Sequence, residues 1–226
     1  MLYRIAVSVV WVVWHLVFRI RTVGREKVHG LRRYVLCANH CHAVDPVFVV
    51  VSRASERQMV VMAKEELFQI HPFISWFFRA MGAVPVSRGK GDTRAVDQCI
   101  EEVRNGKGLL IFPEGTRSHT GQPGKVKSGA FVVAAAAGAS LVPCRIVYDA
   151  GGPRLFSRVT IIYGDPVPCE ELGLADGARS ATVLRRAKNW LLDQWQQLYL
   201  DNTTPAQQQA DLLRAQSLQE AADGDH

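Results

Sequence analysis

The sequence has no apolar run of about 20 residues, and this absence excludes a polytopic membrane protein, because a spanning helix needs that length. It has only five cysteines, an odd number without a C-x-x-C pair, which excludes a disulfide framework and a cysteine-based zinc site. Hydrophobic residues make up 48% and charged residues 21% of the 226 residues, which excludes a disordered chain and a collagen-like repeat. We therefore expect one folded domain with reduced thiols, typical of a cytosolic compartment.

Positive charge is concentrated at the start of the chain. The formal net charge is +6, and residues 1–35 alone carry seven Lys and Arg residues against Glu26. Residues 201–226 have a net charge of −4. A basic end beside an apolar stretch favours contact with an anionic membrane surface, and a solvated basic face is the alternative. Nucleic acid is not expected as a partner, because the basic residues are not interleaved with aromatic residues in a binding motif.

An apolar segment of 14 residues, 5–18, lies between Arg4 and Arg19. As a helix it would be about 21 Å long at 1.5 Å per residue, which is shorter than the hydrocarbon core of about 30 Å. No small-residue cleavage site follows, so a secretory signal peptide is not expected. It contains aromatic residues that suit a membrane interface: Trp11, Trp14 and Phe18. We expect residues 1–22 to form a membrane-interface anchor helix, and a helix packed on the domain is the alternative.

The rest of the chain alternates between two kinds of segment. Short apolar runs predict buried strands over residues 34–38, 59–63, 108–112, 141–148 and 158–163. Capped or amphipathic stretches predict helices over residues 92–104, 128–137 and 180–198. This alternation indicates a single α/β domain, residues 23–200, with a mixed, mostly parallel sheet flanked by helices. Residues 201–226 are expected to be a polar tail, mobile or weakly helical.

A further helical segment, residues 71–80, reads HPFISWFFRA and is rich in aromatic residues. Trp76, Phe77 and Phe78 cannot all face one core. Both a core helix and a helix that faces a membrane or lines an acyl chain therefore remain open.

The polar block Asn39-His40-Cys41-His42-Ala43-Val44-Asp45 follows directly on the first of these strands. In open α/β sheets, sites gather at the carboxyl ends of strands. His40 and Asp45 are five residues apart, so a helix beginning here would bring them to the same side. A histidine backed by a carboxylate is a general base, because the carboxylate fixes the tautomer and stabilises the imidazolium. No activated serine lies nearby in sequence, which favours direct attack by a substrate hydroxyl.

Two later segments would complete such a site. FPEGTRS, residues 112–118, follows another predicted strand, where Gly115 permits a tight turn and Arg117 offers a planar fork for a phosphate. A short extended run from Gly82 supplies Arg88. Two arginines in apolar surroundings suit a substrate with one phosphate and one apolar chain. A salt bridge to a surface carboxylate is the alternative for each arginine.

These blocks carry a resemblance to a known family. NH-x4-D, G-x5-R, FPEGTRS and Val142-Pro143 occur in this order. With these separations, residues 25–170 resemble the PlsC-type glycerolipid acyltransferases, whose best-known members are the 1-acyl-sn-glycerol-3-phosphate acyltransferases. H-x4-D alone is a weak signal, whereas FPEGTRS is specific and the ordered set more so.

The resemblance implies a reaction in phospholipid biosynthesis. An acyl group passes from acyl-CoA or acyl carrier protein to the free hydroxyl of 1-acyl-sn-glycerol 3-phosphate (lysophosphatidic acid), forming phosphatidic acid. His40 is implied as the general base and Asp45 as its orienting carboxylate. The residues implied for substrate binding are Arg88, Glu114, Gly115, Thr116, Arg117 and Lys64. No metal or bound cofactor is implied, and the expected location is the cytoplasmic face of the cell membrane, peripheral or monotopic.

Several alternatives accompany this reading. Many family members have serine two positions after the histidine, whereas this chain has His42, which leaves open another lysolipid acceptor. A catalytically inactive lipid-binding protein is the alternative from a different class. The pattern His40-x-His42-x-x-Asp45 also resembles a binuclear metal signature, but the other histidines form no matching set of ligands. Cys41 as a thiol nucleophile is a further alternative.

Overall fold

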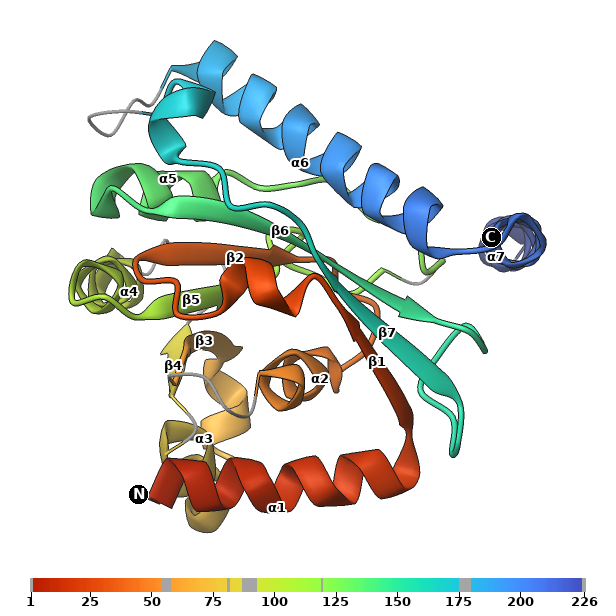
Figure 1. The fold of residues 1–226 in the computed structure, drawn as a ribbon, viewed down its shortest axis with the longest axis horizontal. Helices are drawn as coiled ribbons and strands as arrows, with labels where there is room; N and C mark the ends of the chain where they lie inside the picture. The colour runs from red at the N-terminus through yellow and green to blue at the C-terminus, as the bar shows by residue number, and fades with distance from the viewer. Residues whose placement is uncertain are drawn as a thin grey trace.

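A seven-stranded sheet runs through the middle of the molecule in the computed structural model, with helices on both faces (Figure 1). The structure describes residues 2–53, 58–80, 82–86, 93–118, 120–174 and 180–224. The N-terminal helix lies at one edge of the molecule and the C-terminal helix at another, far from it (Figure 1).

The sheet is mixed and mostly parallel. Its strands are β1 (Arg19–Val23), β2 (Tyr34–Ala38), β3 (Val60–Lys64), β4 (Ala83–Val86), β5 (Gly108–Ile111), β6 (Ser140–Tyr148) and β7 (Arg158–Tyr163), in the order β1-β7-β6-β2-β5-β3-β4. Neighbouring strands are parallel except β6 and β7. The carboxyl ends of β2, β3, β4, β5 and β6 therefore meet at one edge of the sheet.

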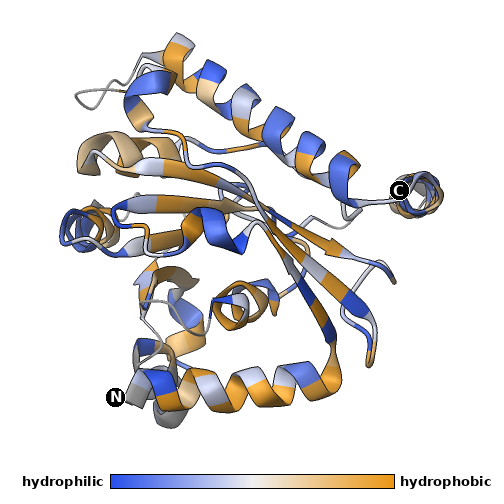
Figure 2. Ribbon diagram, viewed as in Figure 1, coloured by the Kyte–Doolittle hydropathy of each residue, from blue (hydrophilic) through white to orange (hydrophobic). Residues whose placement is uncertain are grey.

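Helices cover both faces of the sheet. They are α1 (Leu2–Val17), α2 (Asp45–Ser52), α3 (Pro72–Ala80), α4 (Thr93–Arg104), α5 (Gly129–Ala137), α6 (Ala181–Asn202) and α7 (Pro205–Gly224). Helices α4, α5 and α6 lie on one side, and α1, α2 and α3 on the other (Figure 1). Side chains alternate along β2, so Val35 and Cys37 join the core with α4 to α6, whereas Leu36 joins the core with α1 and α2. Figure 2 shows the apolar strands between these layers.

Two glycines occupy positions that disfavour a larger residue, each for a different reason. Gly138 ends α5 in the left-handed region, at φ 57°, where a side chain would be strained. Gly108 on β5 pairs with Tyr34 on β2, and a Cβ at Gly108 would lie 2.0 Å from the Tyr34 ring. A larger residue at Gly138 would have a strained backbone, and a larger residue at Gly108 would require the Tyr34 side chain to move.

The predicted α/β class is confirmed, and the five expected strands coincide with β2, β3, β5, β6 and β7 to within one residue at each end. The expected helices over 92–104 and 128–137 match α4 and α5 in the same way, whereas α6 continues to Asn202. The sequence analysis did not assign β1 as a strand. RIRTV alternates exposed and half-buried side chains, which suits an edge strand too short to stand out in sequence.

The N-terminal segment differs from the expected helix over 1–22. The helix ends at Val17, and Arg19–Val23 form β1, which pairs with β7. Within the described residues, every helix is too short or too polar to cross a bilayer. The segment expected as a tail is also structured, because α7 occupies Pro205–Gly224.

Candidate active site

His40 and Asp45 form a hydrogen-bonded pair at the carboxyl edge of the sheet. His40 lies in the loop after β2, and Asp45 is the first residue of α2. His40 Nδ1 lies 2.8 Å from Asp45 Oδ2, and their side chains are 12% and 0% exposed. The expected proximity is present, but the loop and not a shared helix produces it, because α2 begins only at Asp45.

The Asp45 carboxylate accepts hydrogen bonds from four directions. Oδ2 accepts from the backbone N–H groups of Cys41 at 2.7 Å and His42 at 2.8 Å, besides the His40 ring. The Tyr148 hydroxyl donates to Oδ1. Burial and the Asp45 charge raise the pKa of Tyr148, so its hydroxyl stays a neutral donor. These donors use the lone pairs of the carboxylate, fix its orientation and thereby fix the imidazole.

Asn39 anchors the start of this loop to β6. Its side chain is fully buried, its amide N–H donates to the Ile146 carbonyl at 3.2 Å, and its side-chain oxygen accepts from the Ile146 N–H at 2.7 Å. The side-chain amide thus makes the two hydrogen bonds to β6 that the backbone of one further β2 residue would make. The backbone is then free to turn and present His40.

Glu114, which follows β5, holds the same loop by hydrogen bonds from the side opposite β6. Its carboxylate accepts from the His40 N–H at 2.7 Å through Oε1 and from the Gly124 N–H at 2.6 Å through Oε2. Burial raises the pKa of Glu114, while the two backbone donors and Arg145 act in the other direction. Glu114 therefore acts on His40 through the backbone, and the ring of Phe112, 4.3 Å from the His40 ring between centroids, packs beside it.

The FPEGTRS segment lies against the histidine loop. The Ser118 N–H donates to the His40 carbonyl at 2.7 Å, so Arg117 is next to a residue bonded to His40. Gly115 has φ 71°, and a Cβ there would lie 2.5 Å from Lys127 Nζ. Thr116 and Arg117 are exposed. Lys127, which the sequence analysis did not assign to the site, thus adds a cation beside Gly115.

Two predicted binding residues have no described side chain. Arg88 lies outside the described residues, shortly after β4 ends at Val86. Lys64 is the last residue of β3 and is paired with Val86, and its side chain is outside the described part. The strands β3, which Lys64 ends, and β4, which precedes Arg88 in sequence, have their carboxyl ends on the edge that carries His40.

The thiol alternative is disfavoured by the surroundings of Cys41. Burial and the Asp45 charge raise the pKa of the Cys41 thiol to about 12, so it is protonated at neutral pH and is a poor nucleophile. His42 packs edge-on against Tyr148, with ring centroids 4.9 Å apart, beside the pair and not within it. In the part of the chain that the structure describes, no three His, Cys, Asp or Glu residues are grouped to hold a metal ion.

Tyr148 is a site residue that the sequence analysis missed. It ends β6, 103 residues after the carboxylate that it contacts. The available signal was strand alternation: Cys144, Ile146 and Tyr148 lie on the face of β6 that packs with α2, where Asp45 begins.

Comparisons with known proteins agree with this arrangement. Residues 19–147 match the family model described as Acyltransferase. The chain is 33% identical over 115 residues to a chloroplastic 1-acyl-sn-glycerol-3-phosphate acyltransferase of Arabidopsis thaliana, a match that covers 50% of this chain and 31% of that protein. It thus spans about a third of the length of that plant relative.

Shorter bacterial relatives match over more of their length. A 1-acyl-sn-glycerol-3-phosphate acyltransferase of Bacillus subtilis is 27% identical over 168 residues, 74% of this chain and 82% of that protein. A lyso-ornithine lipid O-acyltransferase of Pseudomonas aeruginosa is 34% identical over 134 residues, 49% of this chain and 52% of that protein.

A solved structure shares the fold. The crystal structure of the 1-acyl-sn-glycerophosphate acyltransferase PlsC from Thermotoga maritima aligns with a TM-score of 0.60 and 24% identity, covering 78% of this chain and 70% of that one. The family match spans more than half of this chain and includes the histidine–aspartate pair and the FPEGTRS block. The predicted resemblance is therefore confirmed, and the chain belongs to the Acyltransferase family.

Proposed function

We propose that the protein is an O-acyltransferase that moves a fatty acyl group from acyl-CoA or acyl carrier protein to the free hydroxyl of 1-acyl-sn-glycerol 3-phosphate. The product would be phosphatidic acid. The family match and the names of the relatives support this reaction class. The acyl thioester is a substrate, so the reaction needs no resident cofactor.

The observation that carries the proposal is the hydrogen bond by which Asp45 fixes the tautomer of the neutral His40 ring. A carboxylate oxygen 2.8 Å from Nδ1 requires the ring proton on Nδ1, which leaves the lone pair on Nε2. No described residue bonds to Nε2. The imidazole is therefore placed to accept a proton from a substrate.

The chemistry then proceeds by direct transfer. His40 Nε2 takes the proton of the acceptor hydroxyl as that oxygen attacks the thioester carbonyl carbon. Asp45 stabilises the imidazolium that forms. Collapse of the tetrahedral intermediate breaks the carbon–sulfur bond, and the imidazolium returns its proton to the departing thiolate. No covalent acyl-enzyme is needed, in agreement with the protonated state of Cys41.

Arg117 is assigned to the acceptor phosphate, with Arg88 and Lys64 as further candidates from neighbouring strand ends. Arg117 is exposed, and its neighbour Ser118 bonds to the His40 carbonyl, so a phosphate bound there stays near the base. Glu114, Gly115 and Thr116 shape the same turn.

A second acceptor deserves a parallel test. The relative from Pseudomonas aeruginosa, 34% identical to this chain, is a lyso-ornithine lipid O-acyltransferase. An acceptor of that kind would not use Arg117 as a phosphate ligand.

The test of catalysis is His40→Ala. It should lower kcat by at least 1,000-fold, on the order expected for loss of a general base, while the melting temperature stays near that of the wild type. His29→Ala, at an exposed position, is the matched control. Turnover within tenfold of wild type in His40→Ala would remove the general-base role.

The test of the acceptor compares two lipids at one labelled donor. With Arg117→Met, KM should rise at least tenfold for 1-acyl-sn-glycerol 3-phosphate and stay within about twofold for the donor, since a charge-assisted bond is worth about 1.5–3 kcal/mol. A wild-type preference for lyso-ornithine lipid, with no effect of Arg117→Met, would assign the second acceptor.

We also propose that α1 seats the protein on the cytoplasmic face of the membrane. The inner side of α1 packs on the domain: Val7 is fully buried, and the Trp14 ring lies 6.3 Å from that of Phe48 on α2. The outer side is apolar and exposed, with Leu16 71% exposed. The other members of this outer face are Ile5, Val9, Trp11, Val12 and Val13.

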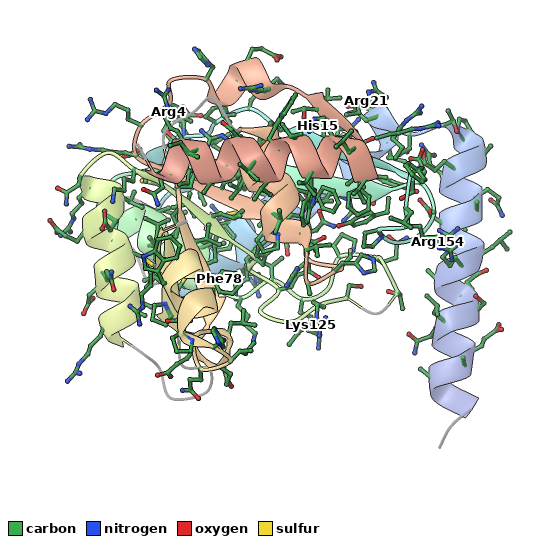
Figure 3. The ribbon with its side chains drawn as sticks, turned by 90° about the horizontal axis from the view of Figure 1, so that it is seen from below. Arg4, His15, Arg21, Phe78, Lys125 and Arg154 are labelled. Atoms are coloured by element: carbon green, nitrogen blue, oxygen red, sulfur yellow. The ribbon has the colours of Figure 1, made fainter. Side chains whose placement is uncertain are left out.

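Other features extend this face. In Figure 3, which views the molecule from the α1 side, α1 crosses the foreground, with Arg4 at one end and Arg21 beyond the other. Leu155 and Phe156 are 72% and 66% exposed, and the Phe156 N–H donates to the Val17 carbonyl at 2.7 Å. The turn before β7 thus continues the apolar surface past the end of α1. Free thiols at all five cysteines fit a cytoplasmic location.

Leu16→Glu tests this surface. The substitution should weaken sedimentation with anionic vesicles at least tenfold, because burying a leucine side chain contributes about 1.5–3 kcal/mol, and should leave the melting temperature unchanged. Leu213→Glu, at an exposed position on α7, is the matched control and should bind as wild type. Equal binding by Leu16→Glu and wild type would contradict the proposal.

A further inference from the structure

A buried arginine lies beside the histidine loop and is not part of the proposed reaction. Arg145 is on β6 and is 4% exposed. Its Nε and Nη1 atoms are buried and have no hydrogen-bond partner among the described residues. A guanidinium stays charged in proteins, and a buried charge without a partner is costly. Such a group is stable when a ligand supplies the missing acceptors.

Arg145 lines a cavity of about 70 Å³. That space is several times what a single water molecule needs. The histidine loop contributes Cys41 and His42 to the lining, and the end of β6 contributes Tyr148. The cavity is therefore on the Tyr148 side of the Asp45 carboxylate, and Arg117 and His40 are not among its lining residues.

The remaining walls are rich in hydrogen-bond donors. Ser118, the last residue of FPEGTRS, and Thr120, just after it, present hydroxyl groups. Arg214 on α7 adds a second guanidinium, whose Nη1 is 2.9 Å from Asp211 Oδ1. The Asp211 charge is thus already paired. Arg145 has the Tyr199 ring 5.4 Å from its Cζ atom, and the Glu114 and Asp211 charges act on it without a hydrogen bond among the described residues.

We infer that this cavity binds a phosphate group, with Arg145 as its principal ligand. An arginine fork with Nε–H and Nη–H free matches two oxygens of a tetrahedral oxyanion, and hydroxyl donors can reach the others. The phosphate is carried by the acyl donor, by the acceptor or by free phosphate. Assigning the carrier rests on the proposed function, whereas the anion site itself does not.

The site is tested with inorganic phosphate and the full-length protein. Phosphate should raise the wild-type melting temperature at constant ionic strength set with chloride, because a ligand that binds the folded state stabilises it. Arg145→Met should weaken the derived affinity at least tenfold. Arg186→Met, the same change at an exposed position on α6, should stay within twofold of wild type.

Arg145→Lys keeps a buried cation and serves where the Met variant does not fold. It lacks Nε–H and the planar fork, so its phosphate affinity should fall at least threefold. A wild-type phosphate response in either variant, or no phosphate response in the wild type, overturns the site.

The carrier is identified by a second set of ligands. Binding of coenzyme A that weakens in Arg145→Met, with binding of 3′-dephospho-coenzyme A unchanged, assigns the donor's 3′-phosphate. Weakened binding of both assigns the phosphates nearer the thiol, and weakened binding of sn-glycerol 3-phosphate assigns the acceptor. A response confined to inorganic phosphate assigns the free ion. These measurements need no turnover, so an active His40→Ala variant would defeat the proposed reaction and leave the phosphate site standing.

Discussion

Three consecutive backbone N–H groups of the histidine loop donate to two buried carboxylates. The His40 N–H donates to Glu114, and the Cys41 and His42 N–H groups donate to Asp45. Asp45 also bonds the His40 ring, so one acidic residue fixes the side chain and the other fixes the backbone that carries it. Charge-assisted bonds of this kind are about twice as strong as neutral ones. The position of the His40 imidazole therefore depends on both carboxylates.

Glu114→Gln tests this dependence at a single atom. A glutamine can accept at only one oxygen, and its NH₂ group would face the N–H of His40 or Gly124. We expect kcat to fall roughly 10- to 100-fold, since a lost charge-assisted bond costs about 1.5–3 kcal/mol, with KM for the donor nearly unchanged. Glu171→Gln, at an exposed position, should have no effect.

The pH dependence of stability gives Glu114→Gln an independent readout. Burial raises the pKa of Glu114 above its ordinary value of 4.5, so the folded protein holds this proton at a higher pH than the unfolded chain. The contribution of Glu114 to stability is then complete below pH 4.5 and declines as the pH rises through the folded-state pKa. Melting temperatures from pH 4 to 8 should lose this component in the variant, and identical profiles would contradict the assignment.

The sequence alone identified those candidate site residues that belong to short motifs. His40, Asp45 and Glu114 belong to NH-x4-D and FPEGTRS, where neighbouring residues carry the signal. The sequence analysis did not identify Tyr148 and Arg145, because their positions beside the site depend on the pairing of β2 with β6, in which Ala38 is opposite Cys144. That register places side chains more than 100 positions apart around one loop, and one sequence does not specify it.

Elements held by polar contacts were harder to predict than elements held by apolar ones. α6 was expected because Ala187, Leu191 and Trp195 recur on one face, and all three are buried. α7 lacks such a stripe and was expected to be a weakly helical tail. It contacts the domain through Asp211, which accepts from the Tyr199 hydroxyl at 2.9 Å, and through Arg214, which packs over Gly151.

Tyr199→Phe should loosen α7 without unfolding the sheet. The change removes one hydrogen bond to a carboxylate, worth about 1.5–3 kcal/mol, and keeps the aromatic ring under Arg145. Hydrogen exchange should accelerate at least tenfold in residues 205–224, while protection in β2, β5 and β6 stays as in the wild type. Asn202→Ala, which removes a side-chain amide that donates to the Leu198 carbonyl at 2.9 Å, separates a local effect on the end of α6 from release of α7. Unchanged exchange in α7 would show that the Asp211 contact does not hold it.

The two ends of the whole molecule carry opposite charges. Residues 1–35 have a net charge equal to that of the entire chain, and they include α1 and β1. Residues 201–226 have a net charge of −4 and include α7, which lies away from α1 (Figure 1). An anionic surface attracts the first end and repels the second, so the charge distribution favours an orientation with α1 on the membrane and α7 away from it.

The salt dependence of vesicle binding distinguishes this orientation from non-specific binding that depends on the net charge alone. Replacing Arg4 and Arg21 by serine should weaken binding to anionic vesicles at least tenfold at low salt, because each basic residue near such a surface contributes about 1 kcal/mol. Replacing Arg185 and Arg186, exposed on α6, removes the same charge and should change binding less than threefold. At about 1 M salt the Debye length is only about 3 Å, so charges are screened. The wild type and both double variants should then bind equally through the apolar face of α1. If replacing the α6 pair weakens binding as much as replacing the N-terminal pair, binding depends on the net charge of the protein. The proposed orientation with α1 on the membrane would then be wrong.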